Sequence, residues 1–485
     1  MTSAASRLLR EVRDISSQQI PVVFGEPEEA DILHWRGMIL GPPHTPYALG
    51  MFHFDLKFPQ DYPNSAPKVL ITTTSGGQVR FNPNLYASGK VCLSILGTWR
   101  AEHSGEQWSA VQSSQSILLS IQSLMNDAPY HNEPSFEADD GSGDVQRYNE
   151  KISHESVRVA VCEVMEDTVE NRAVSSNGTS AAFSTTRKQL FFMYYQVYLG
   201  IVKAAIEKKE LRDGAAFKMM PFECSSNGMH GNYQWTKLQA RLDKIHAQLM
   251  LEVQDWRAQG TQQTALRKRG ADSAVNSCVD YLAQQQERID HEAPDGVSVG
   301  VDEANVCVWV ATIFGPAETL WDGGMFQVEL VFPPDFPDAP PYVHFLTSMF
   351  HPHISPLGVP YLRHLIMWNH LEPKEKSVSS LLTVLEPGQT RRPRSCRAGH
   401  LRLSKRPHAC SWWPSVLQSR RALEQSLDRL GPAAQPRSRP EPPLDTRVPL
   451  RSDYPGARRA ARVGSVARAR NAPQPRGGVP GLLEE

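Results

Sequence analysis

The sequence lacks the signals of several large protein classes. No apolar run approaches the ~20 residues that a membrane-spanning helix needs, and the most apolar stretch, residues 190–202, contains Gln196. We expect that stretch to be a buried helix. The N-terminal residues have helical periodicity without the apolar core of a signal peptide, and no GxxxxGK[ST] loop for nucleotide phosphates is present. These absences predict a soluble intracellular protein, either cytoplasmic alone or both cytoplasmic and nuclear, without a membrane partner and without a cofactor.

Cysteine is scarce as well. The 485 residues include seven cysteines, which are scattered and form no C-x-x-C pair. An odd and dispersed set argues against a disulfide framework and against a zinc cage. We therefore expect a reducing compartment and no metal site.

The chain has almost no net charge, at -1, but its acidic and basic residues are distributed unevenly along the sequence. Residues 388–485 hold 20 Lys and Arg against 7 Asp and Glu, whereas the remainder holds 31 against 45. The basic tail, 387–485, is rich in Arg and Pro without sustained periodicity, which predicts disorder; a mistranslated segment is the alternative. It lacks the interleaved aromatic residues that stack on bases, so no nucleic-acid partner is expected.

The sequence does contain one long internal repeat. Residues 41–69 align with residues 315–343 at a constant offset of 274 and without a gap, and 13 of the 29 positions are identical. Two copies at this distance indicate a duplicated domain rather than a solenoid of short repeats.

Each copy has the same order of predicted elements. In the first, residues 7–17 have an amphipathic helical pattern, residues 51–58 alternate as a strand, and residues 113–125 form a later amphipathic helix. Strands grouped before the later helices favour an α+β fold with an antiparallel meander sheet. The predicted segments are a first domain (1–168), a helical extension (169–252), a polar linker or helix extension (253–271), a second copy of the domain (272–386) and the basic tail (387–485).

One cysteine has unusual surroundings. In "FNPNLYASGKVCLSIL", Cys92 stands between an Asn-Pro-Asn turn and an apolar run. A packed thiol needs no such setting, whereas a working thiolate needs a rigid backbone and a hydrogen-bond donor beside it. We therefore predict that Cys92 is a nucleophile; a buried structural thiol is the alternative.

The ordered motifs resemble those of ubiquitin-conjugating enzymes. The resemblance rests on Gly-Pro…Thr-Pro-Tyr, "FPQDYP", Asn-Pro-Asn and Gly-Lys-Val-Cys-Leu, and it covers residues 7–250. The stretches "LSILGTW" and "YHNEPSFE" and the helical extension are similar to the large members of this family. The resemblance implies the α+β ubiquitin-conjugating (UBC) fold, here in duplicate, and a Cys92 that accepts ubiquitin or a ubiquitin-like modifier as a thioester.

The same resemblance implies the partners. An activating enzyme, which consumes the ATP, hands over the modifier, and a substrate lysine or a ubiquitin ligase receives it. Relatives dock ligases through an aromatic residue and a Ser-Pro-Ala segment, where this chain has Asn64 and Ser109-Ala110-Val111, so the ligase stays open. The alternative is a non-catalytic adaptor that binds ubiquitin or conjugation partners through its two copies.

Two further residues acquire roles from the resemblance. Asn84 occupies the place of the asparagine in the family's His-Pro-Asn motif, whose amide donates to the oxyanion of the transfer step; one such donor is worth ~3 to 4 kcal/mol. Asn82 replaces the histidine of that motif. For Asn84 an Asx-type turn role is the alternative. His131, in "YHNEP", aligns with the mouth of the site and either assists proton movement or caps a turn.

The second copy has lost these groups. Its stretch "FHPHISPLGVPYL" puts His353 at the Asn84 position and Tyr361 at the Cys92 position. A phenol with a pKa of about 10 cannot replace a thiolate in acyl exchange. We expect no metal site at His351 and His353, since no further ligand is suitably spaced. This copy therefore either regulates by binding or is a decaying duplicate.

Overall fold

The computed structural model describes residues 3–17, 22–99, 107–170, 183–208, 211–224, 228–269, 278–291, 294–349, 351 and 353–385. They belong to one compact unit, Met1–Gln435, whereas a second unit, Pro436–Glu485, lies outside the described residues. The predicted basic tail and the last two residues of the predicted linker, 270 and 271, also lie outside them.

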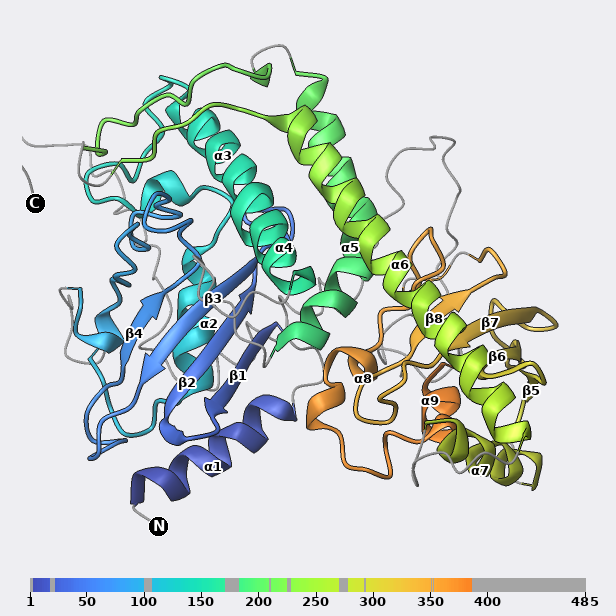
Figure 1. Cartoon of the computed structure of the whole chain (residues 1–485). Coiled ribbons are helices and arrows are strands. Elements are labelled where there is room, and N and C mark those ends of the chain that lie inside the picture. Colours follow the sequence, from blue (N-terminus) through green and yellow to red (C-terminus); the bar gives the residue numbers. More distant parts are fainter. Residues whose placement is uncertain are drawn as a thin grey trace, which may run out of the picture. The chain divides into compact units, whose positions relative to one another are not determined.

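The first copy is built around a four-stranded antiparallel sheet in the order β1-β2-β3-β4. Strand β3 forms at the predicted place, with Phe52, Phe54 and Leu56 packed in the core that helix α2 closes from one side (Figure 1). Its other face is buried as well, so every residue of the strand except Lys57 is buried. Helix α2 begins with a capping box at Ser113, which satisfies the first free backbone N–H groups. The elements are α1 (Ser3–Ser16), β1 (Val23–Glu28), β2 (Asp31–Leu40), β3 (Met51–Lys57), β4 (Lys68–Ile71), η1 (Ser94–Leu96), α2 (Ser114–Leu124) and η3 (Pro129–Asn132).

The second copy repeats this plan. Its sheet is again an antiparallel meander, β5-β6-β7-β8, so the predicted duplicated α+β fold is confirmed. The elements are α7 (Cys278–His291), β5 (Val297–Asp302), β6 (Asn305–Phe314), β7 (Met325–Val331), β8 (Tyr342–Phe345), α8 (Arg363–Ile366), η7 (Trp368–His370) and α9 (Val378–Leu385).

The repetition extends to single hydrogen bonds. The indole N–H of Trp108 donates to the carbonyl of Pro63 at 2.8 Å, and Trp368 donates in the same way to Pro337 at 2.8 Å. At Gly41 an added Cβ would lie 1.9 Å from a backbone oxygen, and 1.6 Å at the equivalent glycine of the second copy. Identity at such positions reflects a backbone approach that only glycine permits.

Long helices connect the two copies. A continuous helical segment, α3 (Asp144–Glu155), η4 (Ser156–Glu163) and α4 (Val164–Val169), precedes α5 (Ser184–Ile206) and α6 (Trp235–Lys268), which lie side by side (Figure 1). Helix α5 contains the apolar stretch 190–202, which was predicted to be a buried helix. Helix α6 continues to Lys268, so most of segment 253–271 is a helix extension rather than a linker. Its buried residues Gly260 and Thr264 pack on the second copy.

Residues from both copies share one hydrophobic core with these helices. The face of the first sheet opposite α2 contributes Phe24, Met38 and Met51, and the second copy contributes Tyr342 and Ile366. None of the helices in the described part of the chain combines the length and the apolar character needed to cross a membrane.

Specific contacts join α5 to the second copy. The ring centroids of Phe192 and Tyr342 are 5.0 Å apart, and the Thr186 hydroxyl donates to the carbonyl of Ile366 at 2.9 Å. Helix α5 therefore contacts both copies, since it also covers the first sheet through the shared core.

Candidate active site

The turn before the cysteine is organised by Asn82, which is fully buried. Its amide donates to the Tyr47 hydroxyl and to the Leu124 carbonyl, both at 2.9 Å, and its Oδ1 accepts from the backbone N–H of Asn84 at 3.0 Å. An asparagine can make all three bonds because its amide carries donors and an acceptor. Asn82 thus supplies the Asx-type turn at the motif's first position.

Asn84 and Cys92 are tied together twice. The backbone N–H of Cys92 donates to the carbonyl of Asn84 at 2.9 Å, and the Asn84 amide donates back to the carbonyl of Cys92 at 3.1 Å. The structure therefore brings these two predicted site residues together. The Asn84 Oδ1 is buried without a hydrogen-bond partner among the described residues.

Cys92 is almost completely buried. Only 1% of its surface is exposed, and Tyr86 is its electrostatic neighbour. Burial and then the neighbouring Cys92 raise the pKa of Tyr86. Sequence reasoning missed Tyr86, although an aromatic residue two positions after Asn84 was visible in the motif.

Arg80 holds Tyr86 in place. Its guanidinium carbon lies 4.8 Å from the centre of the Tyr86 ring, within the range of a cation–π contact. Arg80 also donates to the carbonyl of Pro83 at 2.8 Å and pairs with Glu133 at 3.2 Å. This buried arginine, which sequence reasoning also missed, joins the Asn-Pro-Asn turn to the "YHNEP" segment.

His131 makes a local contact. Its Nδ1 lies 2.7 Å from the carbonyl oxygen of Phe136, so it donates there, and its ring packs edge-on against Tyr130. None of its hydrogen bonds or ring contacts among the described residues joins it to Cys92 or Asn84. The neighbouring Asn132 instead reaches the turn, donating to Asn82 Oδ1 at 3.3 Å. This geometry favours the turn-capping alternative for His131 over the proton-transfer role.

The loop after the cysteine is closed by Thr98. Its hydroxyl donates to the carbonyl of Val91 at 2.7 Å and accepts from the N–H of Leu93 at 3.0 Å. Trp99, in contrast, is exposed. Residues 100–106, which follow it, lie outside the described residues.

The second copy keeps the turn and changes the side chains. The backbone N–H of Tyr361 donates to the carbonyl of His353 at 2.6 Å, as the N–H of Cys92 does to the carbonyl of Asn84. The N–H of His353 donates to His351 Nδ1 at 3.1 Å. Tyr361 packs against Tyr194 of α5, with ring centroids 5.9 Å apart. Within the described ranges, no three His, Cys, Asp or Glu residues are grouped so as to hold a metal ion.

Other described thiols are built differently. Cys162, in η4, is completely buried in the shared core, and burial raises its pKa to about 12. Such a thiol stays protonated at neutral pH, as a packed residue does.

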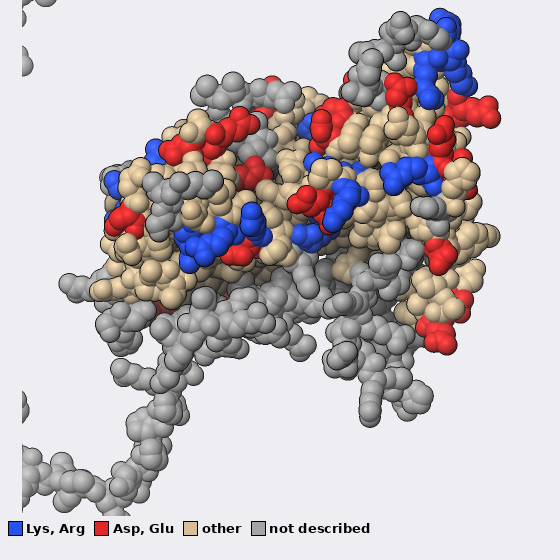
Figure 2. Space-filling view, turned by 90° about the horizontal axis from the view of Figure 1, so that it is seen from below, with Lys and Arg blue, Asp and Glu red and all other residues tan. Residues whose placement is uncertain are grey.

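On the face seen from below the view of Figure 1, acidic and basic side chains of the described residues are interspersed, and neither sign forms a continuous area across it (Figure 2).

Comparison with known proteins identifies the family of the chain. The protein-family model described as ubiquitin-conjugating enzyme matches residues 7–155 and 281–411. The ubiquitin-conjugating enzyme E2 Z of Xenopus tropicalis is 39% identical over 242 residues, which are 50% of this chain and 70% of that protein. The proteins of the same name from Danio rerio and Homo sapiens are 44% and 49% identical, over 41% and 33% of this chain and 56% and 44% of their own lengths. The two matched segments correspond to the two sheets, and the chain belongs to the ubiquitin-conjugating enzyme family.

Proposed function

We propose that the chain carries ubiquitin, or a ubiquitin-like modifier, as a thioester on Cys92 and passes it to a lysine or a ligase. The observation that supports this most is the double tie between Cys92 and Asn84. It fixes the thiol on a closed turn beside the amide that the family uses in transfer.

Two acyl exchanges make up the reaction. In charging, the Cys92 thiolate attacks the thioester carbon held by the activating enzyme, and the thiolate of that enzyme leaves. In transfer, a substrate amine attacks the new thioester, the bond to Cys92 breaks, and the amine proton passes to a base or to water. Each exchange passes through a tetrahedral oxyanion, which a positioned amide donor stabilises.

The site has to accommodate the thioester during this cycle. The Asn84 amide donates one N–H to the carbonyl of Cys92, and its second N–H is left to donate to the oxyanion. The Cys92 thiol is almost fully covered, so the residues around it must open to admit the incoming thioester.

The proposal is tested by charging the purified chain with activating enzyme, ATP and ubiquitin and reading a non-reducing gel. We expect one adduct that reductant removes. Cys92→Ser is expected to replace it with an adduct that resists reductant, because an oxygen ester exchanges poorly with thiols. Cys162→Ser is the matched control and is expected to charge normally. A reducible adduct that survives in Cys92→Ser would contradict the assignment, and the absence of any adduct would favour a non-catalytic adaptor.

A further inference from the structure

A pocket opens between the loop that joins β2 to β3 and three of the helices that follow. Its volume is about 320 Å³, a size typical of small-molecule sites. The loop contributes Thr45 and Pro46 to its lining, and the helices α3, α5 and α6 contribute, among others, Ser153, Ala204 and Trp235. We call this space the helix pocket.

Trp235, the first residue of α6, lines the helix pocket and has an indole N–H without an acceptor. The residue is 1% exposed, and its Nε1 is buried without a hydrogen-bond partner among the described residues. Four other tryptophans donate this N–H to backbone carbonyls at 2.8 Å: Trp35, Trp108, Trp309 and Trp368. A buried donor without an acceptor is costly, so a carbonyl oxygen of a ligand would be favoured beside Trp235.

His154 fixes the position of this indole. The ring centroids of His154 and Trp235 are 4.8 Å apart, and the His154 Nε2 accepts from the backbone N–H of Gln234 at 3.0 Å. The donor is therefore held in place before a ligand arrives, which lowers the cost of ordering the site on binding.

The charged groups of the helix pocket favour a cation. Asp127 and Glu150 line it together with Lys208, whose Nζ lies 3.5 Å from Glu150 Oε1. Burial lowers the pKa of His44, which also lines the pocket, so this histidine adds no charge at neutral pH. Two carboxylates and one ammonium leave the lining with one excess negative charge, which attracts a cationic ligand and opposes an anionic one.

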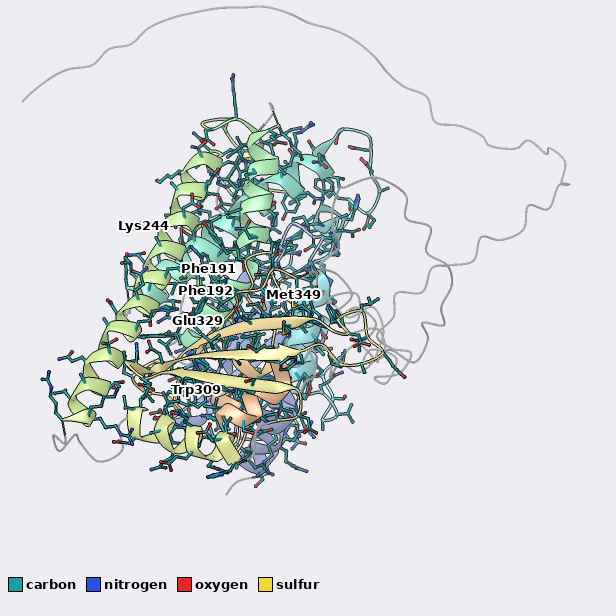
Figure 3. All side chains as sticks on the ribbon, turned by 90° about the vertical axis from the view of Figure 1, so that its right-hand side faces the viewer. Phe191, Phe192, Lys244, Trp309, Glu329 and Met349 are labelled. Carbon is teal, nitrogen blue, oxygen red and sulfur yellow. The ribbon has the colours of Figure 1, made fainter. Side chains whose placement is uncertain are left out.

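The wall that α5 contributes is aliphatic. Ile201 and Ala204, near the end of that helix, line the helix pocket, whereas in its first half Phe192 packs on His246 of α6 with ring centroids 6.3 Å apart. Figure 3 shows Phe192 on α5 and Lys244 on α6, the neighbouring helix. Where α5 carries short side chains instead of rings, the space beside α6 stays open to a small apolar group.

We propose that the helix pocket binds a compact ligand with a primary ammonium, a short aliphatic body and an amide carbonyl, as in an aliphatic α-amino amide. The ammonium would donate to the carboxylates of Asp127 and Glu150, the aliphatic body would lie on Ala204, and the carbonyl would accept from the N–H of Trp235. A free amino amide and the N-terminal residue of a polypeptide share this chemistry. This inference is independent of thioester chemistry at Cys92.

The test titrates the full chain with four small probes in ligand-observed NMR. Leucinamide has all three groups, and we expect it to bind with a Kd of about 1 mM or lower. N-acetylleucinamide lacks the ammonium, isopentylamine lacks the carbonyl and leucine adds a carboxylate, and each is expected to bind about fivefold more weakly or worse. No binding of leucinamide, or equal binding of leucine, would overturn the proposal.

Variants then locate the site. Ala204→Phe puts a ring into the helix pocket from an exposed position of α5, and it is expected to abolish leucinamide binding. Ile206→Phe, at a residue of the same helix that is 43% exposed and lies outside the pocket lining, is the matched control. Equal affinities of the two variants would overturn the location, and unchanged urea midpoints show that each remains folded.

Two polar variants test the assigned contacts. Trp235→Phe removes the N–H and keeps an aromatic ring, so it should weaken leucinamide about fivefold and leave isopentylamine unchanged. Asp127→Asn should weaken both amines about fivefold, because both carry the ammonium. If Trp235→Phe weakened both amines equally, the loss would be structural and the carbonyl contact would be wrong.

A last probe separates the two sources of the ligand. Leucyl-alanyl-alanine amide presents the same N-terminal residue with a chain that must leave through the mouth of the pocket. Binding as tight as that of leucinamide supports the N-terminus of a polypeptide, and binding at least about tenfold weaker supports a free amino amide. Cys92→Ser should bind leucinamide like the unmodified chain, so failure of the thioester proposal and failure of this one are read separately.

Discussion

At the residue scale, the Asn84 side chain has one hydrogen bond in the structure and is expected to make another during transfer. In the structure its amide bonds the carbonyl of Cys92, a role in shaping the turn, whereas transfer requires the same amide on an oxyanion. Because Asn82 independently closes the turn through the N–H of Asn84, the backbone arrangement does not depend on the Asn84 side chain alone. The two alternative roles of Asn84 are therefore compatible.

Asn84→Ala is expected to leave charging nearly intact and to slow discharge to free lysine by ~10²-fold, the usual effect of one lost oxyanion donor. Single-turnover discharge of the preformed thioester measures the second step alone. Asn149→Ala, which removes an amide bonded to Asp127 in another part of the first copy, is the control. Equal losses in charging and discharge would make Asn84 a structural turn residue only.

Tyr86→Phe keeps the ring on which Arg80 stacks and removes the phenol hydroxyl whose pKa the neighbouring Cys92 raises. If that hydroxyl donates to the attacking sulfur, its removal takes away about 1.5–3 kcal/mol, the usual contribution of a hydrogen bond to a charged group. We expect alkylation of Cys92 by iodoacetamide at pH 7, read by mass spectrometry, to slow by about tenfold. An unchanged rate together with an unchanged urea midpoint would show that the hydroxyl only packs.

The sequence predicted part of this site and not the rest. Motif order was sufficient to pair Cys92 with Asn84, because both lie on one short turn. Arg80 and Tyr86 were missed because their contact depends on side-chain directions that a local pattern does not encode. His131 had two possible roles, and only the position of the Phe136 carbonyl distinguishes them.

At the scale of secondary-structure elements, helix α5 is the element that contacts both copies. Its short apolar run predicted a buried helix, and it is one. The sequence could not predict which surfaces bury it, since Tyr194 meets Tyr361 across 167 residues of chain. The loss of the nucleophile in the second copy left an aromatic residue that packs against this helix.

This packing makes the second site difficult to restore. In a Cys92→Ser background, Tyr361→Cys is expected to give no reducible adduct with activating enzyme, ATP and ubiquitin. The new thiol would lie against Tyr194, and His353 would still occupy the Asn84 position. A reducible band in the double variant would show that the position is accessible and that only the nucleophile is missing.

At the scale of the whole molecule, the two copies are coupled through one core. Met250 lies inside α6 (Trp235–Lys268), so a chain cut there would lose half of a helix and uncover the apolar face of α5. Such a deletion would confuse loss of regulation with loss of folding. Substitutions at the contact between α5 and the second copy separate the two effects.

Phe192→Ala removes a ring that is 6% exposed and packs against Tyr342. Truncating a buried phenylalanine costs about 3–5 kcal/mol, and we expect one cooperative urea transition, seen by tryptophans of both copies, to shift as a whole. Leu251→Ala, at an exposed position of α6, should leave it in place. Two transitions, of which only one moves, would show that the copies unfold independently and that the second is a passenger.

The shared core also has a consequence for biosynthesis. The first sheet is completed early, but the core that buries Phe24 and Met38 includes Ile366, which is translated about 160 residues after α5 ends at Ile206. At the usual ~5–20 residues per second, the apolar face of α5 waits ~8–32 s for its last partner. During that interval the nascent chain presents to the ribosome exit and its chaperones a surface that the finished protein conceals.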